Sequence, residues 1–299
     1  MPDFHSWIRT IAVGLGLSVP AASLMVAEGA LHVEHRPASS EFSKGPEYRP
    51  PDSTWQPVRI QAADGVPLDA WLMTPAHPTG GVVTLLHGVG DTRLGMQGYA
   101  YFLLQAGYAA LLPDARGHGA SGGSVISYGV REAPDLERWS EWLNAQHPDW
   151  RQYGLGVSLG AAILLESLAG PTHFRAVVAE SPFGSFEEVA YDRLAMESGM
   201  PRWAFWPVVQ LGFLYARVRY GIDLRKASPA DAVRATNVPI LLIHGDRDTH
   251  IPVRHSFELQ ALRPRTTQLW VIRGAEHVQC LRIGGAEYER RVIDWFGKH

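Results

Sequence analysis

The chain has 299 residues, of which 46% are hydrophobic, 10% aromatic and 19% charged. This balance excludes an intrinsically disordered chain, a collagen-like repeat and a coiled coil. The formal net charge is −3, so no basic excess points to nucleic acid as a partner. The single cysteine, Cys280, excludes an internal disulfide framework and a cysteine-based zinc site.

The N-terminal region is the first feature in chain order. No residue from Thr10 to Ala27 is charged, and the small residues of Val19–Ala21 resemble a cleavage site. We therefore expect residues 1–34 to be a signal peptide or an N-terminal membrane anchor, and a buried or amphipathic helix of the domain is the alternative. Residues 35–55 are rich in Pro, Ser and Glu and predict a linker. On this interpretation the protein is exported or membrane-anchored, and otherwise it is cytoplasmic.

The rest of the chain, residues 56–299, alternates short apolar runs with helical patterns. Two strands around Asp64 and Gly65 predict a hairpin, and the later runs are unbroken, as in strands that are buried on both faces. Strand followed by helix predicts a mostly parallel sheet with helices on both faces, and hence an α/β domain. We expect strands at 58–63, 68–74, 82–87, 109–113, 153–157, 176–180, 239–244 and 268–272, and helices at 99–106, 132–144, 159–168, 257–262 and 287–296.

One connection, at about residues 183–237, is much longer than the usual link between a strand and a helix. Its centre, Pro201–Tyr220, carries six aromatic residues. This pattern predicts a helical cap over the C-terminal edge of the sheet. Most of the aromatics are expected to pack the cap onto the body. A few, with Trp206 as the candidate, are expected to line an apolar acyl pocket, and contact with a membrane surface is a third interpretation.

The pentapeptide Gly156–Gly160 has the pattern G-x-S-x-G. It follows a predicted strand and opens an Ala-rich helix, which is the setting of a nucleophilic serine on a tight turn. The helix N-terminus would stabilise negative charge that develops next to Ser158. We therefore expect Ser158 to be a catalytic nucleophile, against the alternative of a serine in a glycine-rich turn.

A nucleophilic serine needs a base, and the base needs a carboxylate that orients it. His277 follows the last predicted strand, and two carboxylates, Asp246 and Asp248, follow the strand before it. Each residue therefore lies in a loop after the C-terminal end of a strand, in the chain order Ser, Asp, His. We favour Asp248 because Asp246 lies next to the strand, where it is placed to serve the turn.

The loop His87–Gly90 ends the first buried strand, where a backbone N–H can point at the reacting oxygen. We expect the amides of Val89 and Leu159 to form an oxyanion hole, against the alternative of a glycine-rich turn with no such role.

Two further groups have structural interpretations. Asp114 and Arg116 are expected to brace the turns near the site by hydrogen bonds. Glu180 ends a buried strand and needs a partner, either as support for the site or within a local network. We interpret Cys280 as a small buried hydrophobe.

Taken together, the segments LLHGVGDTR, PDARGHGASGG, GVSLGAA, ESPF, LLIHGDRDTHIP and GAEH resemble the α/β-hydrolase superfamily. The resemblance runs from about Val58 to the C-terminus. It is strongest to the branch of monoacylglycerol-lipase-like and serine-aminopeptidase-like hydrolases. It implies an eight-stranded sheet, a lid after the sixth strand, and Ser158, His277 and Asp248 as nucleophile, base and orienting acid. Serine at position 158 argues against the haloalkane dehalogenase and epoxide hydrolase branches, which use aspartate there.

The sequence therefore predicts a serine hydrolase that cleaves carboxylic esters through an acyl-enzyme, with a small acyl ester as its substrate. No cofactor, metal or nucleic acid is expected. A serine exopeptidase is the first alternative, and Glu187, Glu188 and Asp192 are its candidate anchors for a peptide amine. A non-catalytic binding protein on the same fold is the second. The N-terminal segment would provide any membrane association.

Overall fold

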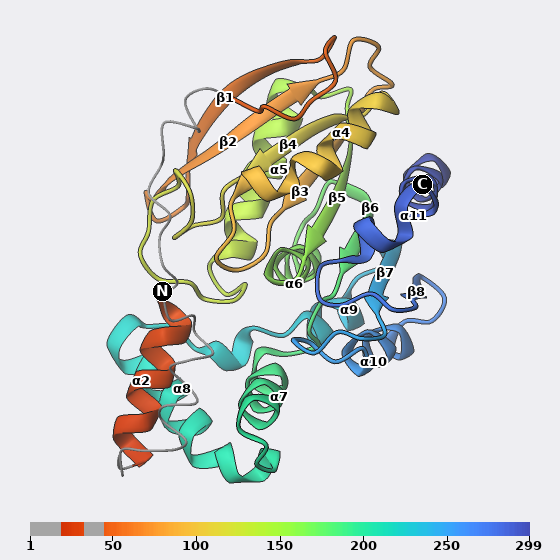
Figure 1. The fold of residues 1–299 in the computed structure, drawn as a ribbon. Coiled ribbons are helices and arrows are strands. Elements are labelled where there is room, and N and C mark those ends of the chain that lie inside the picture. Colours follow the sequence, from red (N-terminus) through yellow and green to blue (C-terminus); the bar gives the residue numbers. More distant parts are fainter. Residues whose placement is uncertain (1–18, 33–44) are drawn as a thin grey trace.

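A computed structural model describes residues 19–32 and 45–299 (Figure 1). In this part of the chain eight strands form one sheet, in the order β1-β2-β4-β3-β5-β6-β7-β8. The pairs β1–β2 and β2–β4 are antiparallel, and all other pairs are parallel. The predicted mostly parallel eight-stranded sheet is confirmed. The strands are β1 (Thr54–Gln61), β2 (Pro67–Thr74), β3 (Gly81–Leu86), β4 (Ala109–Pro113), β5 (Arg151–Val157), β6 (Phe174–Glu180), β7 (Ile240–Gly245) and β8 (Thr267–Ile272).

The first strand begins four residues before its predicted start, at Thr54 rather than at Val58. Pro57 lies inside it, opposite Trp71 of β2. Proline cannot donate a ladder hydrogen bond, but β1 is an edge strand and needs donors on one side only. The proline therefore does not interrupt the strand.

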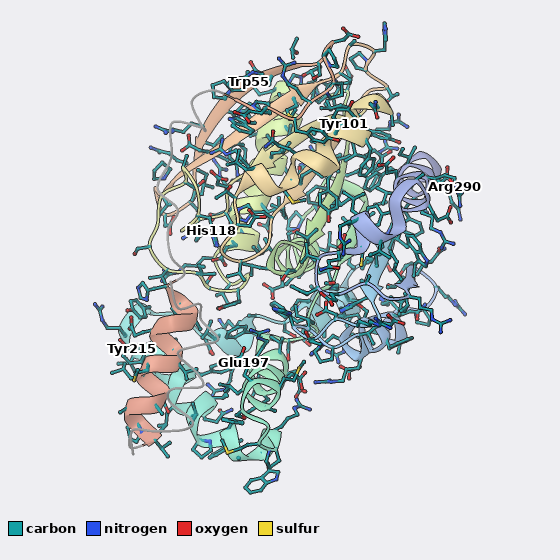
Figure 2. All side chains as sticks on the ribbon, viewed as in Figure 1. Trp55, Tyr101, His118, Glu197, Tyr215 and Arg290 are labelled. Carbon is teal, nitrogen blue, oxygen red and sulfur yellow. The ribbon has the colours of Figure 1, made fainter. Side chains whose placement is uncertain are left out.

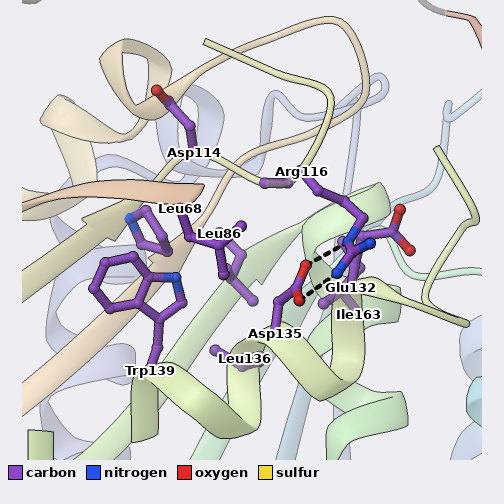
Figure 3. Close-up of a pocket in the computed structure, with 11 residues that line it drawn as sticks. Leu68, Leu86, Asp114, Arg116, Glu132, Asp135, Leu136, Trp139 and Ile163 are labelled. Atoms are coloured by element: carbon purple, nitrogen blue, oxygen red, sulfur yellow. Dashed lines mark hydrogen bonds and ion pairs between the residues drawn. The ribbon is translucent and has the colours of Figure 1, made fainter. Parts of the chain in front are cut away.

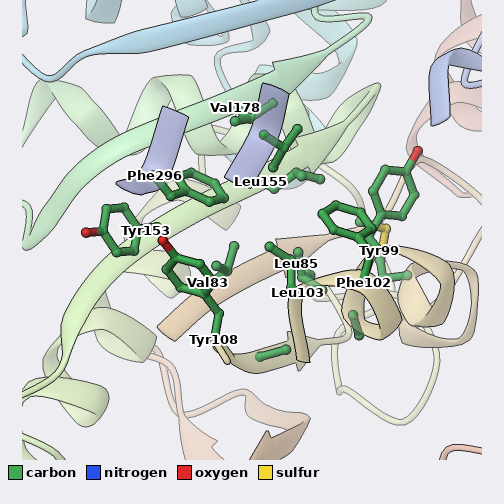
Figure 4. Close-up of a cluster of buried hydrophobic side chains, with 14 of the residues drawn as sticks. Val83, Leu85, Tyr99, Phe102, Leu103, Tyr108, Tyr153, Leu155, Val178 and Phe296 are labelled. Carbon is green, nitrogen blue, oxygen red and sulfur yellow. The ribbon is translucent and has the colours of Figure 1, made fainter. Parts of the chain in front are cut away.

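Helices cover both faces of the sheet, as the alternating pattern predicts. One face packs against α4 and α11 around an apolar cluster that includes Tyr108, Tyr153 and Phe296 (Figure 4). The other face packs against α5, α6, α9 and α10. The helices of the body are α4 (Gln97–Gln105), α5 (Glu132–Gln146), α6 (Leu159–Glu166), α9 (Pro229–Ala235), α10 (Arg254–Leu262) and α11 (Cys280–Lys298).

The last helix, α11, begins at Cys280, seven residues before its predicted start. Gly284 and Gly285 follow the first turn of this helix, and because glycine disfavours a helix, the sequence pattern predicts a helix only after them. Gly285 has φ 50° and ψ −135°, so the helix is kinked there. A left-handed residue of this kind is favourable only for glycine.

The long connection between β6 and β7 forms the predicted helical cap, with α7 (Phe186–Ser198) and α8 (Trp206–Tyr220) as its main helices. An apolar cluster, which includes Phe183, Phe186, Phe213 and Ile251, lies at the centre of the cap. Trp206, the candidate for an acyl pocket, is 61% exposed, and Trp203 is 79% exposed. Neither tryptophan belongs to this cluster, so the buried aromatics of the cap are its phenylalanines.

The described part of the N-terminal region is a helix, α2 (Val19–Leu31), that packs along α8 of the cap (Figure 1). Glu28 accepts hydrogen bonds from the hydroxyls of Tyr215 and Tyr220, and Tyr215 lies at this contact in Figure 2. The carbonyl of Leu31 accepts from the amide of Ile126 at 2.9 Å. In the structure this segment is therefore a helix packed on the domain, which is the alternative to a separate leader.

Residues 1–18 and 33–34 of the predicted leader and residues 35–44 of the predicted linker lie outside the described residues. The remaining linker residues, 45–53, lie against the body, where the amide of Tyr48 donates to Gln97 Oε1 at 3.0 Å. Across the described ranges, no helix combines the length and the apolar character that a membrane crossing requires.

Candidate active site

Ser158 lies on the turn between β5 and α6, at the C-terminal edge of the sheet. Its φ is 53°, a conformation that is costly for a residue with a Cβ, and only 6% of its surface is exposed. The glycines on either side of Ser158 are required because neighbouring backbone atoms leave no room for a side chain. A Cβ at Gly156 would lie 2.4 Å from the carbonyl oxygen of residue 160, and one at Gly160 would lie 2.3 Å from that of Leu86. The motif therefore holds Ser158 in the strained turn that a nucleophilic serine requires.

His277 and Asp248 lie in line with this serine. His277 Nε2 is 2.9 Å from Ser158 Oγ, and His277 Nδ1 is 2.7 Å from Asp248 Oδ2. A carboxylate can only accept, so Nδ1 carries the proton and donates it to Asp248. Nε2 is then the acceptor for the hydroxyl of Ser158. The structure thus brings together the three residues that the sequence singled out at the ends of β5, β7 and β8.

Asp248 is held as a charged group in a buried place. Its Oδ1 accepts from the amides of His250 and Ile251 at 2.8 and 2.9 Å. His244 Nε2 lies 3.3 Å from Oδ2. Burial raises the pKa of Asp248, but hydrogen bonds from His244 and His277 outweigh burial and hold that pKa well below its usual range. The carboxylate therefore stays ionised across the neutral range.

Asp246, the competing carboxylate, has a different partner. Its Oδ1 accepts from the amide of Gly274 at 2.6 Å, and this bond ties the turn after β7 to the turn after β8. The structure therefore places Asp246 in the turn and Asp248 at the histidine.

The two residues expected to bind an oxyanion through their amides, Val89 and Leu159, belong to segments that adjoin Ser158. Leu159 is the first residue of α6, and the first N–H groups of a helix have no partner within it. Val89 follows Gly88, where a Cβ would lie 3.4 Å from Ser158 Cβ. His118 Nε2 accepts from the amide of Gly90 at 3.3 Å, which ties this loop to the loop that carries His118. The loop before Val89 therefore lies against Ser158, and Leu159 begins the helix that follows it.

The loops behind the site are braced by two buried ion pairs, as predicted for Asp114 and Arg116. Asp114 accepts from the amide and the guanidinium of Arg93. Arg116 binds Asp135 through two hydrogen bonds of 2.5 and 2.6 Å (Figure 3). A small cavity beside Arg116 is lined by residues of the α5–α6 face, and neither Ser158 nor His277 is among them. It is therefore separate from the candidate active site.

Sequence reasoning missed one neighbour of the site. The ring of His250 stacks on that of His277, with centroids 5.0 Å apart and an interplanar angle of 12°. His250 lies two residues after Asp248 in the same loop. Its side-chain direction depends on how the loop folds around the carboxylate, and no sequence pattern reports that.

Two of the three acidic residues singled out at the start of the cap form ion pairs, and the third accepts from a neutral side chain. Glu188 contacts Arg202 and Arg254, and Asp192 contacts both arginines and His255. Glu187 accepts from the side-chain amide of Gln210 at 2.7 Å. Glu188 and Asp192 are thus neutralised by arginines rather than left free for a cationic ligand.

Comparison with known proteins shows that the chain is similar to hydrolases. The model of the family described as "Serine aminopeptidase, S33" matches residues 77–218. Among curated proteins, the uncharacterized protein YqkD of Bacillus subtilis is 28% identical over 239 residues, which cover 79% of this chain and 77% of that protein. The uncharacterized protein YfhR of Escherichia coli is 24% identical over 260 residues, 83% of this chain and 82% of the relative.

Solved structures add an esterase and a peptidase. The Pyrococcus furiosus esterase Pf2001 superimposes with a TM-score of 0.67 at 26% identity, over 82% of this chain and 92% of that one. A Pyrococcus horikoshii acylaminoacyl peptidase superimposes with a TM-score of 0.62 at 18% identity, over 82% of this chain and 41% of the peptidase. The peptidase shares the fold alone at this identity.

Proposed function

We propose that this α/β hydrolase, which is similar to the serine aminopeptidase family, is a serine hydrolase that cleaves carboxylic esters through an acyl-enzyme. The observation that carries the proposal is the continuous hydrogen-bond chain from Ser158 through His277 to the ionised Asp248. This arrangement is what activation of a serine hydroxyl requires.

In the proposed mechanism, Ser158 Oγ attacks the ester carbonyl while its proton passes to His277 Nε2. The amides of Val89 and Leu159 stabilise the negative oxygen of the tetrahedral intermediate. The intermediate collapses, and the leaving alcohol takes the proton from His277. Water, with His277 as base, then attacks the acyl-enzyme, and the acid and the free Ser158 hydroxyl are regenerated.

Two of the three candidate anchors, Glu188 and Asp192, are held in ion pairs, which favours an ester over a free peptide. The third, Glu187, is hydrogen-bonded to the neutral side chains of Gln210 and Tyr191. An aminopeptidase needs an unpaired carboxylate for the substrate's ammonium group. The candidates Glu188 and Asp192 are each engaged by Arg202 and Arg254. Recruiting either for an amine would break ion pairs that already exist, which supports an uncharged acyl substrate.

The test compares two chromogenic substrates, p-nitrophenyl butyrate and alanine p-nitroanilide, with Ser158→Ala as the blank. We expect turnover of the ester, little turnover of the anilide, and labelling of the wild type by a fluorophosphonate. Faster turnover of the anilide would favour the exopeptidase. Absence of both turnover and labelling would favour a binding protein.

A further inference from the structure

A second buried carboxylate lies beside the candidate active site. Glu180 is the last residue of β6 and is fully buried. Its Oε2 accepts from the hydroxyls of Tyr288 and Tyr99 at 2.8 and 3.1 Å, and its Oε1 accepts from the amide of Cys280 at 3.0 Å. Burial raises the pKa of Glu180, and these three donors act in the opposite direction. The proposed mechanism uses none of these contacts.

This one residue is hydrogen-bonded to the backbone of Ser158 and to that of Cys280, which follows His277 closely in the chain. Its backbone carbonyl accepts from the amide of Ser158 at 2.8 Å. Its side chain holds Cys280, the first residue of α11, which is three residues after His277. A carboxylate at a helix N-terminus also interacts favourably with the helix dipole. Glu180 therefore connects the nucleophile turn to the start of the helix that follows the histidine loop.

Backbone strain gathers around the same residue. Four non-glycine residues in the described ranges have positive φ, namely Tyr128, Ser158, Ser181 and Val278. Ser158 is bonded to the Glu180 carbonyl, Ser181 is its neighbour in the chain, and Val278 lies between His277 and Cys280. Strained residues of this kind persist only where the surrounding contacts hold them in place. The bonds of Glu180 are such contacts for the two strained turns that carry Ser158 and His277.

We propose that Glu180 is a positioning residue that sets His277 against Ser158 through its bond to the amide of Cys280. It touches neither the substrate nor the reacting atoms. The inference rests on the proposed function, because it assigns Glu180 to the same reaction. A misplacement of reacting groups by about 1 Å can reduce turnover on the order of 10²-fold.

Two substitutions separate the bond from the bulk of the side chain. Glu180→Met keeps the length of the side chain but removes both acceptors. Glu180→Gln keeps an amide oxygen that can accept from Cys280, so it is the conservative rescue. Glu166 is the matched control, because it is a half-buried glutamate at the far end of α6 whose Oε1 is buried, and its side chain does not bond to the histidine loop. Glu166→Met and Glu166→Gln therefore test the same chemical changes away from the site.

Turnover of p-nitrophenyl butyrate is measured for each variant at a temperature below its melting temperature. The rate is divided by the concentration of sites that a fluorophosphonate labels. We expect Glu180→Met to lower kcat on the order of 10²-fold and to change KM by less than about twofold. This is the pattern expected when the reacting groups are misaligned but the substrate still binds. Glu180→Gln should lie between Glu180→Met and the wild type, and the Glu166 variants should match the wild type. Equal kcat in Glu180→Met and Glu166→Met would overturn the proposal.

A readout that needs no turnover keeps this inference separate from the proposed function. The proton on His277 Nδ1, which is bonded to Asp248, gives a downfield NMR signal. We expect that signal to shift or broaden in Glu180→Met and to stay unchanged in Glu166→Met. An unchanged signal in a folded Glu180→Met protein would reject the positioning role, even if the wild type cleaved no ester. A shifted signal with an inactive wild type would reject the ester reaction alone. Should Glu180→Met fail to fold, Glu180→Leu takes its place, because leucine also lacks both acceptors, and an unchanged kcat and signal in Glu180→Leu would count against the role.

Discussion

His277 Nδ1 lies 2.7 Å from Asp248 Oδ2, although the two residues are 29 positions apart in the chain. Asp246, the other candidate carboxylate, lies closer to the end of β7 in the sequence and accepts instead from the amide of Gly274. The two carboxylates of one short loop thus have separate tasks. One faces the histidine and the other ties two turns together.

This difference predicts unequal effects of two matched substitutions. Asp248→Asn removes the acceptor that orients the imidazole, and a loss of turnover on the order of 10⁴-fold is expected. Asp246→Asn leaves an amide oxygen that can still accept from Gly274, so its effect should be small. Ester turnover of both variants at equal labelled-site concentration checks this. A larger loss in Asp246→Asn would show that the assignment is reversed.

The packing of α2 predicts that the N-terminal helix contributes to stability. Leu31 is fully buried against the cap, whereas Leu24 on the same helix is 42% exposed. Leu31→Ala should lower the free energy of unfolding by about 2–5 kcal/mol. Leu24→Ala, the matched control, should change it by less than about 0.5 kcal/mol. Urea denaturation measures the free energy of unfolding of the two variants, and mass spectrometry of the native protein shows whether residues 1–34 are present. Equal stabilities, or a native mass that lacks residues 1–34, would favour a leader that is removed.

The exposure of Trp206 changes what is expected of the cap. An apolar acyl group gains about 0.8 kcal/mol for each buried CH₂, so butyrate esters should be turned over faster than acetate esters. Trp206 is 61% exposed and lies outside the apolar cluster of the cap. We therefore expect Trp206→Ala to leave the butyrate-to-acetate ratio of kcat/KM unchanged. A selective loss of activity on butyrate would place the indole in the acyl pocket after all.

Glu166 predicts a pH dependence of stability. Burial, with the nearby charge of Glu132, raises the pKa of Glu166 to about 9. The folded state therefore keeps a proton that the unfolded chain loses near its ordinary pKa of 4.5. The protonated carboxyl of Glu166 is therefore accommodated without cost to the folded state below pH 4.5, and the stability of the protein falls as the pH rises toward 9.

Glu166→Gln replaces the neutral carboxyl by a neutral amide of the same shape. We expect the variant to be more stable than the wild type at pH 8 and close to it at pH 5. Midpoints of urea unfolding at these two pH values measure the difference. Parallel changes in both proteins would mean that the carboxyl of Glu166 titrates normally.

The sequence by itself determined the strand order along the chain, the glycine-flanked turn and the loops that carry the candidate residues. These features are local. An unbroken apolar run has to be buried on both faces, and Gly156 and Gly160 stand where no Cβ fits. The eight strands and the cap between the sixth and seventh of them follow from the same pattern, agree with the resemblance to α/β hydrolases, and are confirmed.

Only the tertiary structure decided how distant groups pair. The sequence pattern could not show that α2 packs on α8, because a run without charges is equally suited to a leader, a membrane and a protein surface. It could not show that Glu180 joins Ser158 to Cys280, because a buried carboxylate finds its donors from segments that lie about a hundred residues away. Hydrogen bonds and apolar contacts act over a few ångströms in space, so their partners are set by the folded chain and not by distance along it.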